Sequence, residues 1–297
     1  MTQKKETQIL ILSLIITVTI LGVGHWSFTR GKEVNTTTND SPKPTQTINN
    51  QSTVSIGSEL LIVEDDTPQK KAGIEAFKEG NYSEAIAQFQ TSLQLQSNDP
   101  EALIDLNNSQ AAKNNPIKIA VVVPIGGKLN IAKEILRGVA QVQNKVNEQG
   151  SINGKLLQVA IVNENNNPEI ASKVAHKLVK DDSILAVVVH HSSDATLGAA
   201  PVYQHGQLVM VSPTSDAKTI STLGDYIFRT VPSIRFQADQ LSRYLINTAQ
   251  KTNVAICFDS RAEYSLSLKE ECTSAIFSDG GKVIEINCDL ADKSLKT

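Results

Sequence analysis

The sequence is poor in aromatic residues and has no excess of positive charge. Phenylalanine, tryptophan and tyrosine account for 4% of its 297 residues, and 31 acidic residues outweigh 28 basic ones, giving a net charge of −3. A chain that binds nucleic acid usually carries a basic patch, or aromatic side chains on which bases stack. Because the sequence has neither feature, we expect no nucleic-acid partner.

Cysteine is also scarce. The chain has three cysteines, Cys257, Cys272 and Cys288, and they form neither a Cys-x-x-Cys pair nor the Cys/His spacing of a zinc site. We therefore expect no metal site, and no motif indicates another cofactor. Cys257 and Cys288 lie in apolar, strand-like runs, so the sequence favours small buried thiols. One disulfide among the three is the alternative if the compartment is oxidising.

Catalytic motifs are missing as well. The sequence has no Gly-x-Ser-x-Gly and no Ser/His/Asp arrangement, and Gly126-Gly127-Lys128 lacks the spacing of a phosphate-binding loop. His190 and His191 are neighbours at the end of a predicted strand, where adjacent side chains point to opposite faces, so joint metal binding is unfavourable. The sequence therefore predicts a binding protein rather than an enzyme, with no catalytic residue.

One long apolar run lies near the N-terminus. Residues 9–28 include no charged residue, and their number matches a helix that crosses a bilayer. Lys4 and Lys5 precede the run and Trp26 stands near its end, which favours a cytoplasmic tail over residues 1–8. We predict an uncleaved signal anchor, and a cleaved signal peptide is the alternative. Either one places the rest of the chain outside the cytoplasm, in the periplasm.

A polar stretch and a helical segment follow the apolar run. We predict a disordered linker over residues 29–66, because much of it is rich in Thr, Asn, Ser and Gln without apolar periodicity. Residues 67–113 then show helical spacing, with breaks at Gly80-Asn81 and Asp99-Pro100 that separate three helices. The sequence therefore predicts a small all-α module after the linker.

This module resembles a tetratricopeptide repeat. The residues at repeat-like positions are Gly73, Tyr82, Ala85, Phe89 and Pro100. Ser92 and Ser97 depart from the resemblance, since the repeat usually has Ala and Pro there. Stacking of such repeats usually needs about three of them. The sequence therefore favours a spacer or an oligomerisation element, and a protein partner bound in a groove of the module is the alternative.

From residue 117 onwards, short apolar runs alternate with amphipathic segments. This alternation predicts an α/β fold with a parallel sheet and right-handed crossovers. The predicted strands are 117–123, 156–162, 185–189 and 208–211, and the predicted helices are 131–146, 169–179 and 195–204. After Pro232 the alternation restarts, with helices at 236–248 and 264–277 and strands at 253–258 and 282–287. We therefore predict a first lobe over 117–235 and an incomplete second lobe over 236–297.

Small hydroxyl residues follow two of the predicted strands. Ser192 and Ser193 follow the strand at 185–189, and Ser212-Pro213-Thr214-Ser215 follows the strand at 208–211. The loops beyond the carboxyl ends of parallel strands form the ligand crevice of such folds. Hydroxyl groups beside helix N-termini suit an anion such as a carboxylate. These residues are therefore predicted ligand contacts, and helix capping is an alternative that is compatible with binding.

Several short motifs together resemble the type I periplasmic binding proteins, specifically their branched-chain amino acid receptor group. The motifs are Leu136-Arg137-Gly138, Asn147–Gly154, Ser212–Ser221 and Gly224–Ser233. The resemblance covers residues 117 to about 290 and implies two lobes that close on a ligand at a hinge.

The same resemblance assigns roles to single residues. It implies that Ser193 and Thr214 meet a ligand carboxylate, that Thr214 and Asp216 contact its carboxylate and ammonium groups, and that Tyr264 covers the ligand from the second lobe. Asp216 departs from the Thr or Ser that the family usually has. Its charge either favours an ammonium group or discourages a carboxylate, so the ligand class stays open.

The resemblance implies a membrane-tethered extracytoplasmic protein that binds an amino-acid-type solute and delivers it to an ABC permease. Family members continue for about one further domain, so we expect a truncated member of the family. One alternative is a tethered sensory or protein-interaction module that reuses the binding fold. The other is a non-functional remnant.

Overall fold

A computed structural model describes residues 54–292 of the chain. The predicted cytoplasmic tail and signal anchor, and the linker as far as residue 53, lie outside the described residues. Among the residues that the structure describes, no helix combines the length and the apolar character needed to span a membrane.

The first lobe is built on a six-stranded mixed sheet with the order β1-β3-β2-β4-β5-β6. The strands are β1 (Val54–Ser55), β2 (Ile117–Val123), β3 (Leu157–Asn163), β4 (Ile184–Val188), β5 (Val209–Ser212) and β6 (Ile227–Arg229). Strands β2 to β6 are parallel, and β1 pairs antiparallel with β3. The four predicted strands of this lobe are present within a residue or two, whereas the sequence pattern missed the short edge strands β1 and β6.

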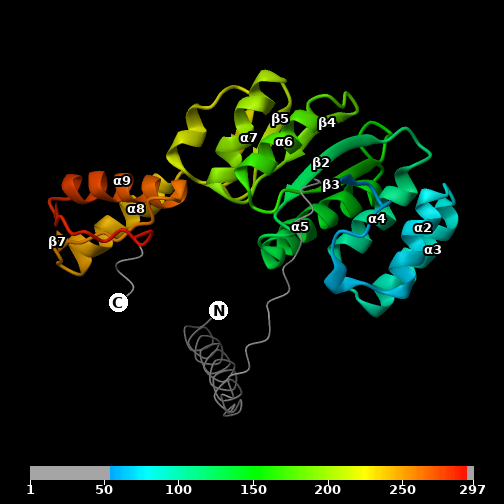
Figure 1. Ribbon diagram of the computed structural model, residues 1–297, viewed down its shortest axis with the longest axis horizontal. Coiled ribbons are helices and arrows are strands. Elements are labelled where there is room, and N and C mark those ends of the chain that lie inside the picture. The colour runs from blue at the N-terminus through cyan, green and yellow to red at the C-terminus, as the bar shows by residue number, and fades with distance from the viewer. Residues whose placement is uncertain (1–53, 293–297) are drawn as a thin grey trace, which may run out of the picture. The chain divides into compact units, whose positions relative to one another are not determined.

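Helices cover both faces of the sheet (Figure 1). Helices α6 (Pro168–Leu178) and α7 (Ser193–His205) pack on one face, and α5 (Leu129–Glu148) packs on the other. The alternation along β2 shows why: Ala120 and Val122 belong to the core under α6 and α7, while Val121 and Val123 belong to the core under α5. A continuous apolar run such as that of β2 therefore indicates a strand that is buried on both faces of the sheet.

The predicted helical module is present as α2 (Pro68–Lys78), α3 (Tyr82–Leu95) and α4 (Pro100–Ala111). Thr67, Asn81 and Asp99 cap the three helix N-termini with side-chain oxygens. The helices enclose their own small core around Phe77 and Phe89. Membership of these helices in the tetratricopeptide class stays a prediction.

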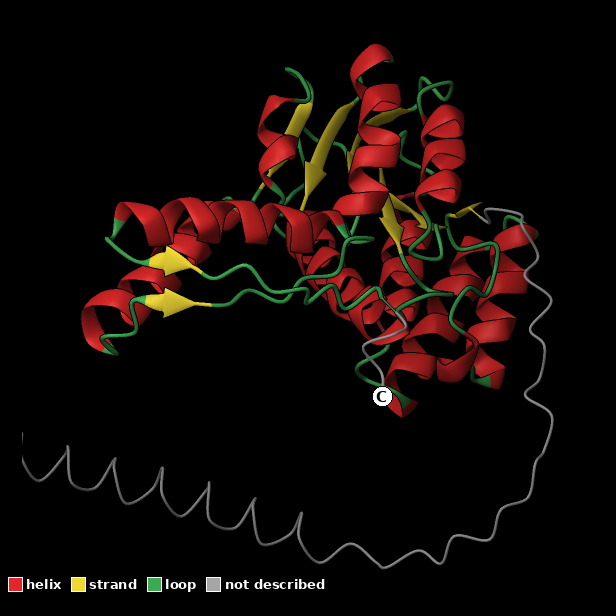
Figure 2. Cartoon of the chain, turned by 60° about the vertical axis from the view of Figure 1, so that its left-hand side comes forward, coloured by secondary structure: helices red, strands yellow, loops and turns green. Residues whose placement is uncertain are grey.

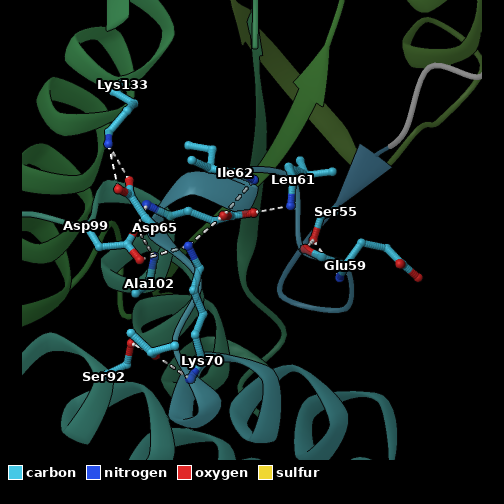
Figure 3. Close-up of polar contacts among 12 residues, drawn as sticks. Ser55, Glu59, Leu61, Ile62, Asp65, Lys70, Ser92, Asp99, Ala102 and Lys133 are labelled. Atoms are coloured by element: carbon cyan, nitrogen blue, oxygen red, sulfur yellow. Dashed lines mark hydrogen bonds and ion pairs between the residues drawn. The ribbon is translucent and has the colours of Figure 1, made fainter. Parts of the chain in front are cut away.

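A buried ion cluster joins this module to the segment that precedes it (Figure 3). Lys70 Nζ lies 2.8 Å from Asp99 Oδ2 and 2.7 Å from Glu101 Oε2, and all three side chains are almost fully buried. The Glu101 carboxylate also accepts hydrogen bonds from the backbone N–H groups of Leu61 (2.7 Å) and Ile62 (3.1 Å). The cluster therefore sets one ammonium group between two carboxyl groups and holds residues 61–62 against α4.

The predicted extent of the linker is wrong for residues 54–66. Val54 and Ser55 pair with β3, Ile62 is completely buried, and a 3₁₀ turn covers Val63–Asp65. The polar composition of the stretch before residue 54 does not continue here, since Ile56, Leu60, Leu61 and Ile62 supply apolar contacts. Burial of these side chains, together with the amide partners that Glu101 provides, offsets the cost of ordering the segment.

Asn108 of α4 ties the helical module to the sheet. Its Oδ1 accepts from the Val159 N–H and its Nδ2 donates to the Val159 C=O, both at 2.8 Å, so the amide pairs with β3 much as a neighbouring strand would. Nδ2 also donates to the Ile56 C=O at 3.0 Å, and Gln143 donates to Oδ1 at 2.8 Å. The described residues 54–292 accordingly lie in one compact unit, and the module is a part of the first lobe rather than a separate domain.

The second lobe is small (Figure 2). It contains α8 (Ile234–Arg243), which continues into a π-helical turn at Tyr244–Thr248, then β7 (Asn253–Val254), α9 (Glu263–Ser278) and β8 (Lys282–Val283). The two predicted strands shrink to two residues each, because β7 and β8 pair only with one another. An isolated two-stranded pair has little to stabilise a longer ladder.

The preference for three free thiols is wrong for two of the cysteines. Cys257 and Cys288 form a disulfide, while Cys272 is free and buried. The chain segments beyond β7 and β8 stay side by side, with hydrogen bonds from Phe258 N–H to Cys288 C=O (3.0 Å) and from Leu290 N–H to Phe258 C=O (2.7 Å). This pairing brings the two sulfur atoms together, which two separate apolar runs in the sequence did not reveal.

Candidate ligand-binding site

The first part of the candidate site is the N-terminus of α7. Ser192 caps this helix, because its Oγ accepts a hydrogen bond from the Ala195 N–H at 3.2 Å. Ser193 is the first helical residue and is buried, and Asp194 follows it. The helix therefore begins at the serine pair that the sequence singled out. Its N-terminus carries the partial positive charge that favours an anion.

The second part is the loop that follows β5, residues 212–216. Ser212 Oγ accepts from the Ser215 N–H (3.0 Å) and donates to the His190 C=O (3.1 Å), which closes a tight turn. Ser215 is buried, and its hydroxyl lies 2.7 Å from Thr196 Oγ1 of α7. Ser215 thus joins the loop to α7, and its hydroxyl is used inside the protein rather than presented at the surface.

Thr214 is exposed and pairs with His191, a residue that the sequence analysis considered only as an unfavourable metal ligand. Thr214 Oγ1 donates to the His191 C=O at 2.9 Å and also lies 3.2 Å from His191 Nδ1. Because the hydroxyl proton is used on the carbonyl, Nδ1 is the donor of the second bond. Burial and the charge of Lys128 lower the pKa of His191. The neutral ring then leaves Nε2 as an acceptor at the site.

Asp216 connects the loop to the second lobe. Its Oδ2 accepts from Gln237 Nε2 of α8 at 2.9 Å, and Arg229 donates to its backbone C=O at 3.0 Å. Burial raises the pKa of Asp216, and the Gln237 hydrogen bond and the Arg229 charge oppose that rise. The 3₁₀ helix at Lys218–Thr222 has Ala217 at its N-cap and no side-chain cap. Asp216 therefore does not cap the next helix.

The third part is the N-terminus of α9 in the second lobe. The Glu263 N–H donates to Asp194 Oδ1 at 3.1 Å, which brings the first turns of α7 and α9 together. Tyr264 follows, 42% exposed. Burial and the charge of Asp216 raise the pKa of Tyr264, so the phenol and this carboxylate influence one another.

The structure therefore gathers the six predicted residues around the starts of α7 and α9 and the loop 212–216. Their contact with a ligand stays a prediction. His191, Asp194 and Gln237 were not predicted as site residues, although His191 and Asp194 flank the serine pair as polar neighbours. Gln237 gave no signal, since it sits on a helix of the other lobe.

Gly126 and Gly127, which superficially suggested a phosphate loop, serve close packing instead. A Cβ at Gly126 would lie 1.9 Å from Asn165 Oδ1, and one at Gly127 would lie 2.3 Å from the Asn165 carbonyl oxygen. Only glycine lets the loop after β2 approach the loop after β3 so closely.

The chain belongs to the periplasmic binding protein family, whose model matches residues 116–295. The Leu-, Ile-, Val-, Thr- and Ala-binding protein of Pseudomonas aeruginosa is 27% identical over 169 residues, which cover 56% of this chain and 45% of that protein. The Leu/Ile/Val-binding protein of Escherichia coli K12 is 28% identical over 160 residues, covering 53% of this chain and 43% of that protein.

Solved structures give the same fold. The structure of a leucine-binding protein from Thermotoga maritima superposes with a TM-score of 0.53 and 19% identity, covering 61% of this chain and 51% of that chain. This chain thus spans about half the length of the relatives that it matches.

Proposed function

We propose that this chain binds a small zwitterionic solute of the amino-acid type at the candidate site. The observation that carries the proposal is the meeting of an exposed hydroxyl (Thr214), a carboxylate (Asp216) and the N-terminal end of α7. A zwitterion needs donors for its carboxylate and an acceptor for its ammonium group, and this arrangement offers both. The named ligands of the sequence relatives support the same class.

In the proposed pose, Ser193 and Thr214 hold the ligand carboxylate beside the α7 N-terminus, with the Thr214 hydroxyl proton turned from the His191 carbonyl to the ligand, and Asp216 receives the ammonium group. Tyr264 covers the ligand from the second lobe. The hydrogen bonds of Gln237 with Asp216 and of Glu263 with Asp194 lie between the lobes. Opening at the hinge would break both bonds, and the ligand would replace the Gln237 bond on closure.

We further propose that residues 9–28 tether the protein to the membrane, with the binding lobes outside the cytoplasm, and that an ABC permease accepts the solute. The uncharged run of residues 9–28 and membership of the periplasmic binding protein family support this location. The Cys257–Cys288 disulfide is consistent with an oxidising compartment.

Titration calorimetry of the purified protein against a panel of amino acids tests the proposed binding. We expect at least one aliphatic amino acid to bind, and the Thr214→Val variant to weaken it about tenfold or more through loss of one hydrogen bond. Thr91→Val is the matched control, since Thr91 is an exposed residue of α3. A folded sample that binds no member of the panel would contradict the proposal.

A second candidate is a protein-interaction module, and the rigid attachment of the tetratricopeptide-like helices to the first lobe favours it. In this case partner binding would depend on exposed residues of α2 and α3 and would survive Thr214→Val. A non-functional remnant would show neither solute binding nor partner binding.

A further inference from the structure

Three fully buried polar residues lie together under α7, behind the candidate site. Glu164 follows β3, His190 follows β4 and Tyr203 belongs to α7, and each has an exposed fraction of 0%. The ring centroids of His190 and Tyr203 are 6.0 Å apart. Burial raises the pKa of Tyr203, and the Glu164 charge raises it further, which places the carboxylate near the phenol.

Four polar atoms of these residues lack a hydrogen-bond partner within residues 54–292. They are Glu164 Oε1, both ring nitrogens of His190 and Tyr203 Oη. The second carboxylate oxygen, Glu164 Oε2, accepts from the Asn167 N–H at 3.2 Å. Buried polar groups are nearly always paired in folded proteins, so a cluster of unpaired donors and acceptors requires a physical explanation.

We propose that Glu164, His190 and Tyr203 form a buried proton-binding site whose protonation state is transmitted to the loop 212–216. The connection runs through the backbone of His190, whose C=O accepts from Ser212 Oγ at 3.1 Å and from Ser215 Oγ at 3.2 Å. A displacement of His190 therefore acts directly on the loop that holds Thr214 and Asp216. The effect on ligand binding rests on the proposed function, whereas the proton-binding site itself does not.

Between about pH 3 and pH 7 the neutral forms of Glu164 and His190 dominate in this site. Burial raises the pKa of Glu164 to about 7. Hydrogen bonds from the backbone amides of Asn167 and Asn166 stabilise the carboxylate and partly oppose this rise. Burial alone lowers the pKa of His190 to about 3. When Glu164 ionises, its proton leaves to solvent, and the carboxylate then accepts a hydrogen bond from Tyr203 Oη or from the N–H of His190.

Glu164 and His190 act on stability with opposite signs. For Glu164, the folded pKa of about 7 lies above the ordinary value of 4.5, so stability falls as the pH rises between these values. For His190, the folded pKa of about 3 lies below the ordinary value of 6.5, so stability rises with pH between them. In the wild-type protein the two contributions cancel between pH 4.5 and pH 6.5.

Urea unfolding of the full chain across this pH interval tests the site. Relative to wild type, Glu164→Gln should make the folding equilibrium constant rise by about tenfold per pH unit, and His190→Gln should make it fall by about tenfold per unit. Glu169→Gln and His176→Gln, at exposed positions of α6, are the matched controls and should match wild type. The proposal is overturned if the Glu164→Gln and His190→Gln slopes both equal the wild-type slope.

A spectroscopic titration of the wild-type protein covers the case in which a variant does not fold. The ¹³C carboxyl signal of Glu164 should titrate with a midpoint near 7, and a midpoint near the ordinary value of 4.5 would exclude the proton-binding site. The Ser215 amide donates to Ser212 Oγ at 3.0 Å, so its signal should titrate with the same midpoint. A Ser215 amide that does not respond would refute the transmission to the loop.

The same titration separates this proposal from the proposed function. Calorimetry with leucine one pH unit below and one above the Glu164 midpoint should give different affinities. Absence of leucine binding at every pH counts against the proposed function and leaves the ¹³C result as the test of the proton-binding site. Equal affinities at the two pH values, with leucine bound, would refute the coupling of protonation to binding.

Discussion

Single residues of the candidate site divide their polar groups between two tasks. Ser212 and Ser215 bind backbone and side-chain partners inside the protein, and they shape the loop. Thr214 stays exposed, so its hydroxyl is within reach of a solute. Asp216 performs both tasks, because its backbone is fixed by Arg229 while its carboxylate faces Gln237 of the other lobe.

Asp216 should determine whether the ligand carries a positive charge. Asp216→Asn keeps the shape of the side chain and removes the charge, so a zwitterionic ligand should lose about 1.5–3 kcal/mol of binding free energy. A neutral analogue without the ammonium group should lose much less. Calorimetry with both ligands measures the difference, and Asp225→Asn, at an exposed position, is the matched control. Equal losses for the two ligands would reduce Asp216 to a structural residue.

The pH dependence of zwitterion binding should reflect the same residue. Because burial raises the pKa of Asp216, its charge should be lost as the pH falls at a higher pH than for an ordinary aspartate. Affinity for the zwitterion should therefore decrease on acidification in wild type. In Asp216→Asn that decrease should be absent, and the comparison of the two profiles by calorimetry is the measurement. A decrease that persists unchanged in the variant would assign it to another group.

Part of the candidate site could be read from the sequence. Ser192 and Ser193 were found because hydroxyl residues follow an apolar strand, a local pattern that also caps a helix. His191 was considered only together with His190, as one half of an unfavourable metal-binding pair. In the structure the two rings lie apart: His191 lies beside Thr214, and His190 lies beside Tyr203. Contacts between lobes, such as Asp216 with Gln237, depend on the folded arrangement and leave no local trace.

Among the secondary-structure elements, those of the second lobe depend most on a covalent link. The core of this lobe is small, formed by Ala238, Ile246, Cys272 and Ile276. The disulfide joins Cys257 and Cys288, which are separated by 31 positions. A disulfide that closes a loop of this length stabilises the folded state by about 2–4 kcal/mol, chiefly because it restricts the conformations of the unfolded chain.

Reduction of the disulfide should therefore loosen the second lobe before the first. Hydrogen exchange of the amides of α9, β7 and β8 should become faster in a reducing agent, while β2 and β3 in the same sample serve as the internal control. Mass spectrometry with and without the reductant measures both regions at once. Unchanged protection of α9 after complete reduction would show that packing alone holds the lobe.

The elements themselves were predictable to different degrees. The strands and helices of 117–212 follow the hydrophobic period and were located within one or two residues. The short strands β1 and β6 have two or three residues, too few for a period to appear. Their existence depends on the neighbouring strands β3 and β5, which no local pattern encodes.

The junction between α4 and β3 should be sensitive to a single substitution. Asn108→Ala leaves the N–H and C=O of Val159 and the amide of Gln143 without their partner, so we expect a loss of about 2–4 kcal/mol in the free energy of unfolding. Urea unfolding measures the loss. Asn130→Ala, at an exposed position of α5, is the control and should change stability little. A small effect of Asn108→Ala would mean that water replaces the amide.

The molecule as a whole is an integrated first lobe with a small second lobe attached. Among residues 54–292, the sheet face on the α5 side is exposed at β6, where Phe228 is 51% exposed, and Leu185 of β4 is 60% exposed. Beside this face lies a groove of about 330 Å³, lined by apolar residues that include Ile119, Val139 and Val188. Apolar surface of this kind marks an interaction surface or a site of further packing.

The integration of the helical module with the sheet leads to a prediction for two shortened chains. A chain of 54–235 keeps α2 to α4, the six-stranded sheet and its covering helices, so it should unfold cooperatively. A chain of 114–297 loses β1 and Asn108, one of the two acceptors of the Gln143 amide, and it also loses Ile62 and Ile104, two fully buried members of the core under α5. Burial of two such side chains is worth about 3–6 kcal/mol, a large part of the stability of an ordinary domain.

The chain of 114–297 should therefore unfold at a much lower temperature than the full chain, or lack a cooperative transition. Circular dichroism during heating gives the transitions, and solution scattering at several concentrations separates unfolding from self-association. The chain of 54–235 controls for the effect of shortening alone, because it lacks about as many of the described residues as the chain of 114–297 does. If 114–297 unfolds cooperatively at the temperature of the full chain, the helices are an independent attachment. The interaction-module alternative would then lose the rigid attachment that favours it.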